Sequence, residues 1–286
     1  MNPHLSFDPV SDVHQLLVYP FMVSALEAGT IVAVVAAVAG WFMVLRRQSF
    51  AGHTLSVMSF PGASGAALAG WPLPVGYFIA CAVAAIAIAG GSLRRGARDR
   101  RQESAVIGTV QVAGFALGFV FLSRYHGVLE SLESLLFGSF LGITRGQVET
   151  LLAVGVGTLA FFAVAGRPLL YASVDEALAR AHGVPVRRLQ VAFLLVLGLA
   201  VAATAQITGV LLVFALLVAP AAAARQLTAR IGLGLALTAA IGLAVTWVGL
   251  GLAYFTDRSS GFYVTTLAFG IYLAACAGRW LATRFA

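Results

Sequence analysis

Long uncharged apolar stretches, separated by short groups of arginines, run through the whole chain. A helix needs about 20 predominantly apolar residues to cross the hydrocarbon core of a bilayer, so the intervals between charged residues measure candidate membrane spans. Seven intervals predict spans directly, at residues 19–45, 50–70, 75–92, 104–123, 150–166, 231–256 and 262–280.

The second and third of these spans come from one stretch, because residues 48–93 contain no charged residue. As one helix that stretch would measure roughly 69 Å, about twice the thickness of a bilayer. Trp71-Pro72-Leu73-Pro74 is where the chain is expected to fold back, since proline ends helices.

Residues 189–224 are also uncharged, and this stretch is too long for one span and short for two. We expect a break at Thr204–Gly209, with one arm short or re-entrant and Pro220 near its end. Counting both arms, the pattern predicts nine spans.

The segment 129–143 is ambiguous, because it is apolar but carries Glu130 and Glu133. Arginines concentrate in cytoplasmic loops. If the segment does not cross, fifteen of the 18 basic residues lie inside and three outside; if it crosses, the division is nine and nine. The first topology is favoured, with the N-terminus outside and the C-terminus inside.

Composition agrees with this topology. The 286 residues are 60% hydrophobic and 10% charged, with a mean hydropathy of +0.94, and so few charges cannot cover the surface of a soluble protein. We therefore expect an all-α, polytopic integral membrane protein that forms a single transmembrane domain over residues 1–286.

Every basic residue is an arginine, which excludes lysine chemistry such as a Schiff base or the P-loop of an ATPase. The net charge of +7 is explained by membrane orientation, so no nucleic-acid partner is expected. Cys81 and Cys276 indicate neither a disulfide framework nor a zinc site. No His-Glu-x-x-His motif is present, and transport, which needs no catalytic group or cofactor, fits better than an enzyme.

Polar groups inside spans are costly and are therefore functional candidates. Glu27 lies in the first span, His53 follows the first arginine pair, and Gln111 lies in the fourth span. Imidazole and carboxylate suit divalent transition metals. The alternatives are a helix-end histidine near the cytoplasm and a carboxyl group hydrogen-bonded to a neighbouring helix.

Residues 175–185 predict a short cytoplasmic helix between two spans, because an acidic pair, Asp175-Glu176, begins it and Gly183-x-Pro185 ends it. It is either an ordinary capped helix in a loop or a docking element for a cytoplasmic partner.

Several motifs, read in order, resemble the permease subunits of zinc, manganese and iron ABC importers. These motifs are 45–56 with Phe60-Pro61-Gly62, Leu135–Gly138, Asp175–Pro185, Thr208–Ala224 and Asp257–Gly261. Where that family commonly has Gly-Asp-Ala-Leu-Ser-His, this chain has Gly52-His53-Thr54-Leu55-Ser56-Val57.

The resemblance implies a homodimeric permease in the bacterial inner membrane, with a cytoplasmic ATPase subunit below each copy and a metal-delivering solute-binding protein outside. It implies that Asp175, Glu176, Ala181 and Gly183 belong to the coupling helix that docks on the ATPase. Zinc is the first expected substrate, because a histidine remains in the signature, and manganese or iron follow. A stand-alone secondary transporter or channel is the alternative, since the broken spans expected around 50–70 and 204–220 also fit that class.

Overall fold

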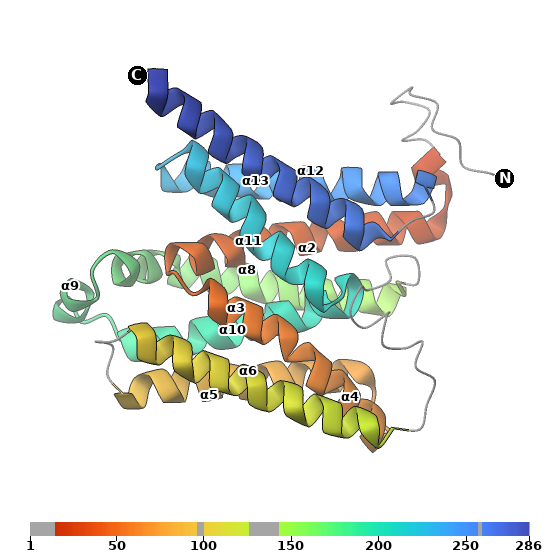
Figure 1. Cartoon of the computed structure of the whole chain (residues 1–286), viewed down its shortest axis with the longest axis horizontal. Helices are drawn as coiled ribbons and strands as arrows, with labels where there is room; N and C mark the ends of the chain where they lie inside the picture. The colour runs from red at the N-terminus through yellow and green to blue at the C-terminus, as the bar shows by residue number, and fades with distance from the viewer. Residues whose placement is uncertain (1–14, 96–99, 126–142, 257–258, 286) are drawn as a thin grey trace.

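The computed structural model describes residues 15–95, 100–125, 143–256 and 259–285. Within these residues the regular elements are α-helices, most of them lying side by side in one bundle (Figure 1). The all-α prediction is therefore confirmed. The helices are α2 (Pro20–Leu45), α3 (Ser49–Val57), α4 (Ser59–Ala69), α5 (Leu73–Arg95), α6 (Arg100–Ser123), α8 (Arg145–Val174), α9 (Glu176–Ala181), α10 (Val186–Thr208), α11 (Val210–Leu227), α12 (Ile231–Thr256) and α13 (Ser260–Phe285).

Among the described residues, seven helices are long and apolar enough to cross a membrane, namely α2, α5, α6, α8, α10, α12 and α13. The two remaining predicted spans correspond to α3–α4 and to α11, whose apolar part is shorter. The number of spans and their orientation stay predictions. The predicted non-crossing segment 129–143 lies almost entirely outside the described residues.

The second predicted span is two short helices, α3 and α4, that meet at Met58. Pro61 explains the interruption, because it has no N–H to donate to the carbonyl of Val57, four residues earlier, and its ring crowds that carbonyl. Cys81 of α5 donates a hydrogen bond from Sγ to the carbonyl of Leu55 at 3.4 Å, beside the break.

Two other turns follow the predicted glycine and proline positions. Gly70 has φ +70° and ends α4 at the fold-back before Pro72. Gly209 has φ +77° and separates α10 from α11. Glycine adopts this backbone region with little strain. Because α11 passes through Pro220 to Leu227, the second arm is longer than expected.

The fifth span is longer than predicted, at 30 residues instead of the interval 150–166. Thr144 begins it with a capping box in which the Thr144 hydroxyl and the Gln147 side chain each bond the other's backbone N–H. The prediction ended the span at Arg167, but α8 continues to Val174 because a charge can lie in a helix where the helix leaves the hydrocarbon.

The core surrounds α2, which packs against α8, α11 and α12. Gly40 marks the closest approach, since a Cβ there would lie 2.0 Å from the carbonyl oxygen of Leu217 on α11. Gly114 and Gly118 of α6 face the α3–α4 junction, where a Cβ would meet the side chains of Met58 and Phe60. Small residues therefore allow close packing around the broken span.

Candidate functional site

His53 lies on α3, the helix that follows the turn after α2. Its ring is half-buried and stands edge-on to the ring of Phe214 on α11, with 4.7 Å between centroids. Nδ1 is buried and has no hydrogen-bond partner among the described residues. One imidazole nitrogen on α3 therefore has no hydrogen-bond partner in the part of the chain that the structure describes.

Gln111 lies on α6 and contacts the residue that follows His53. The hydroxyl of Thr54, which is fully buried, donates a hydrogen bond to Oε1 of Gln111 at 3.0 Å. Gln111 therefore supports α3 directly, which the sequence did not indicate. Val57, at the position where the resembling family has histidine, is a buried apolar residue one helical turn after His53.

Glu27 is exposed on the first third of α2. It precedes Leu45 by about 27 Å along the helix axis, whereas α3 begins just beyond Leu45. The single chain therefore brings Gln111 to the neighbourhood of His53 but leaves Glu27 apart. In the described part of the chain, no group of three or more His, Cys, Asp and Glu side chains could hold a metal ion.

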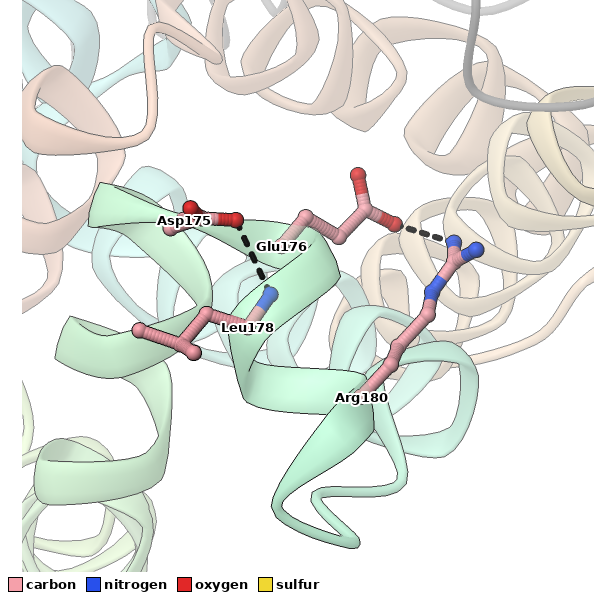
Figure 2. A network of polar contacts seen from close by, with 4 residues as sticks. All are labelled: Asp175, Glu176, Leu178 and Arg180. Atoms are coloured by element: carbon pink, nitrogen blue, oxygen red, sulfur yellow. Dashed lines mark hydrogen bonds and ion pairs between the residues drawn. The ribbon is translucent and has the colours of Figure 1, made fainter.

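The predicted cytoplasmic helix is α9, which packs against α8 and α10 at one end of the bundle (Figure 1). Asp175 is its N-cap and accepts a hydrogen bond from the backbone N–H of Leu178 at 2.9 Å (Figure 2). Glu176 forms an ion pair with Arg180 along the same helix. These contacts define a short helix that is capped at its N-terminus.

Gly183 ends α9 in a Schellman motif. Its N–H donates to the carbonyl of Arg180, the N–H of Val184 donates to the carbonyl of Ala179, and φ of Gly183 is +78°. Ala179 is the buried side of the helix. Ala181 and Leu178 are exposed, and Leu178 is 57% exposed despite being apolar. The outward side of α9 is therefore an ordered surface with apolar character.

Three further polar contacts, which the sequence did not indicate, lie at the same end of the bundle as α9. Arg46 is the C-cap of α2, and its guanidinium lies over the ring of Phe193 on α10, 5.1 Å from the centroid. Gln48 donates from Nε2 to Oε1 of Glu103 on α6 at 3.4 Å. Arg225 of α11 donates from Nη1 to the carbonyl of Val44 at 3.0 Å. Arg46 is half-buried. The sequence pattern gives the side of the membrane on which an arginine lies but not its burial.

Comparisons with known proteins agree over nearly the whole chain. Residues 18–279 match the model of the ABC 3 transport family. The chain is 31% identical over 261 residues to the manganese transport system membrane protein MntC of Halalkalibacterium halodurans, covering 91% of this chain and 88% of the relative. It is 31% identical over 257 residues to the chelated iron transport system membrane protein YfeC of Yersinia pestis, covering 90% and 86%.

A solved structure has the same fold. The structure of PsaBC from Streptococcus pneumoniae in complex with Fab matches with a TM-score of 0.80 at 24% identity, over 93% of this chain and 94% of that chain. The overall fold is therefore shared with an experimentally determined structure.

Proposed function

Because the chain belongs to the ABC 3 transport family, we propose that it is the permease subunit of an ATP-driven importer that moves divalent transition-metal ions. It is a multi-pass transport protein of the bacterial inner membrane and not an enzyme. As proposed, residues 1–286 form a single permease domain whose substrate is the metal ion.

The observation that carries this proposal is α9, an ordered helix with an exposed apolar residue at one end of a membrane bundle. A surface of this kind suits docking of a soluble protein. Since the chain contains no lysine, it has no P-loop, and ATP hydrolysis must be supplied by a separate cytoplasmic subunit. Asp175, Glu176, Ala181 and Gly183 would form the surface on which that subunit docks.

The assembly that we propose is a homodimer of this chain with two ATPase subunits inside and a metal-delivering solute-binding protein outside. One chain offers few metal-ligating side chains. In a homodimer, the second copy would supply further ligands to a path along the dimer axis. His53 would be the main ligand, Gln111 would hold α3 in place, and Glu27 would receive the ion nearer the outer surface.

Two observations favour different metals. A lone histidine, without the aspartate common in the family, favours zinc over manganese. The relatives, in contrast, are named for manganese and chelated iron. We therefore propose manganese or iron ahead of zinc, which reverses the order that the sequence alone favoured.

The test is uptake of radiolabelled manganese, iron and zinc, each in competition with the others, by proteoliposomes that contain the permease, its ATPase and the binding protein. ATP-dependent accumulation of one or more metals is expected. Uptake that continues when the ATPase is omitted would identify a secondary transporter or channel instead, a class that the breaks at Met58 and Gly209 also fit.

A further inference from the structure

The backbone of His53 is held from two sides by its neighbours on α3. Gly52 faces α2, where a Cβ on the glycine would overlap Sδ of Met43. Thr54 faces α6 and donates its hydroxyl to Oε1 of Gln111 at 3.0 Å. Successive residues of an α-helix point about 100° apart, so His53 is directed toward a third helix. Rotation of α3 about its axis would disturb both contacts, which leaves the side-chain torsions of His53 as its free variables.

The imidazole of His53 lacks the contact that usually fixes the orientation of a histidine ligand. A metal-binding histidine commonly donates its second ring N–H to a polar partner, which holds the ring. Nδ1 of His53 is buried and has no such partner among the described residues. The ring instead meets Phe214 of α11 edge-on, with 4.7 Å between centroids and 62° between the ring planes. This T-shaped arrangement is a favoured geometry for two aromatic rings.

Phe214 is itself held in place, because α11 is attached to α2 at two points beyond it. Leu217, about one turn after Phe214, lies where a Cβ on Gly40 of α2 would overlap its carbonyl oxygen. Further along α11, Arg225 donates from Nη1 to the carbonyl of Val44 at 3.0 Å. The ring of Phe214 therefore approaches α3 from a helix whose distance from α2 is set by backbone contacts.

We propose that Phe214 is a positioning residue for His53, and that its ring holds the imidazole in the orientation used in the metal path. Phe214 does not bind the metal, since a phenyl ring has no nitrogen, oxygen or sulfur atom. The inference rests on the proposed function, because the passage of metal past His53 is part of that proposal. Imidazole suits zinc, whereas manganese prefers oxygen ligands. The orientation of the ring should therefore matter more for zinc than for manganese.

Competing uptake of radiolabelled zinc and manganese by the reconstituted complex tests this role. Phe214→Leu should lower zinc uptake about tenfold and manganese uptake only about twofold, a range expected for residues in contact. Phe214→Met, which also removes the ring but fills the space flexibly, should do the same. Phe214→Tyr keeps the ring and should keep the native ratio. Phe161→Leu is the matched control, since Phe161 is also half-buried and its ring meets that of Phe162 on its own helix, α8, at 5.4 Å.

The same substitutions in a His53→Ala background show whether Phe214 acts through the imidazole. There Phe214→Leu should change the ratio of zinc to manganese uptake by less than about twofold, because the group that it positions is absent. An equal loss of both metals in Phe214→Leu, a loss that multiplies with that of His53→Ala, or a changed ratio in Phe161→Leu would each overturn the proposal.

A second measurement does not depend on transport. Diethyl pyrocarbonate acylates accessible imidazoles, and mass spectrometry of peptides from the purified protein in detergent gives the rate at His53. Phe214→Leu should raise this rate several-fold and Phe214→Tyr should leave it near the native value. His182, which is exposed at the end of α9, is the internal reference. Equal rates at His53 in the native protein and Phe214→Leu would show that the ring does not hold the imidazole, and the proposal would be wrong. Absence of ATP-driven uptake in the native complex would instead reject the proposed function.

Discussion

The hydroxyl of Thr54 donates a hydrogen bond to Oε1 of Gln111, 3.0 Å away. This bond joins α3 to α6 one residue after His53, in a helix of nine residues. Short helices are marginal by themselves and depend on tertiary contacts. The orientation of α3, and with it that of His53, therefore depends on this polar contact with α6.

Removal of this bond from either side should destabilise the protein. Thr54→Val and Gln111→Leu should each lower the free energy of unfolding by about 1 kcal/mol, while the double variant should lose less than the sum, because the second change removes the unpaired partner. Thermal unfolding of the purified protein in detergent measures these differences. Thr109→Val is the matched control, since the Thr109 hydroxyl bonds only its own helix, at the carbonyl of Ala105. Strictly additive losses would contradict the contact.

His53 should control both the rate and the selectivity of transport. His53→Ala should lower metal uptake about tenfold or more without loss of expression, because it removes the imidazole that we assign to the path. His53→Asp should retain uptake but shift the preference toward manganese, since carboxylate oxygen suits manganese better than imidazole does. Competition between labelled metals measures the shift. Unchanged uptake in His53→Ala would remove this residue from the path.

The sequence predicted the positions of the long apolar helices well, because lipid exposure requires long uncharged helices and leaves a strong pattern. It also located the fold-back at 71–74, directly after Gly70, and the break at Thr204–Gly209; the structure gives Gly70 and Gly209 a positive φ. It predicted that the spans around 50–70 and 204–220 are broken, but it did not locate the first break at Met58. A proline three residues into a helix and a proline inside a continuous span look alike in sequence.

The site was predicted less completely than the fold. His53 and Gln111 were identified as polar residues in apolar stretches, and the structure places both around α3. The burial of Arg46 and the support from Thr54 depend on which helices meet in space, and local sequence does not contain that information. Glu27 showed the same polar signal, yet it lies on a different part of α2.

The docking surface depends on the conformation of Gly183. Its φ of +78° strains any residue with a Cβ, although a Cβ there would have no neighbour within 4 Å. Gly183→Val should therefore distort the end of α9 and weaken co-purification of the ATPase, whereas Gly183→Asn should weaken it less, because asparagine tolerates this backbone region. Gly70→Val is the control, since Gly70 has φ +70° and equally open surroundings but ends α4. Full co-purification of Gly183→Val would show that α9 is not the contact.

Substitution of Glu27 tests the outer part of the proposed metal path. Glu27→Gln keeps the shape of the side chain but removes its charge, so metal uptake should fall several-fold with unchanged expression if the carboxylate receives the ion. Glu149→Gln provides the comparison, because Glu149 is an exposed carboxylate on α8. Transport rates at low metal concentration should separate the two variants. Equal rates would remove Glu27 from the metal path.

The crossing of α2 and α11 should tolerate an added side chain poorly. A Cβ at Gly40 would lie 2.0 Å from the carbonyl oxygen of Leu217, and backbone atoms cannot move aside as the end of a flexible side chain can. Gly40→Ala should therefore force the helices apart and lower the free energy of unfolding by about 1–3 kcal/mol, the usual cost of overpacking. Gly157→Ala on α8 has no neighbour within 4 Å of the added Cβ and should unfold at the native temperature or slightly above it, because alanine favours helix. Thermal unfolding in detergent compares the two variants. Equal midpoints would mean that α2 and α11 do not approach this closely.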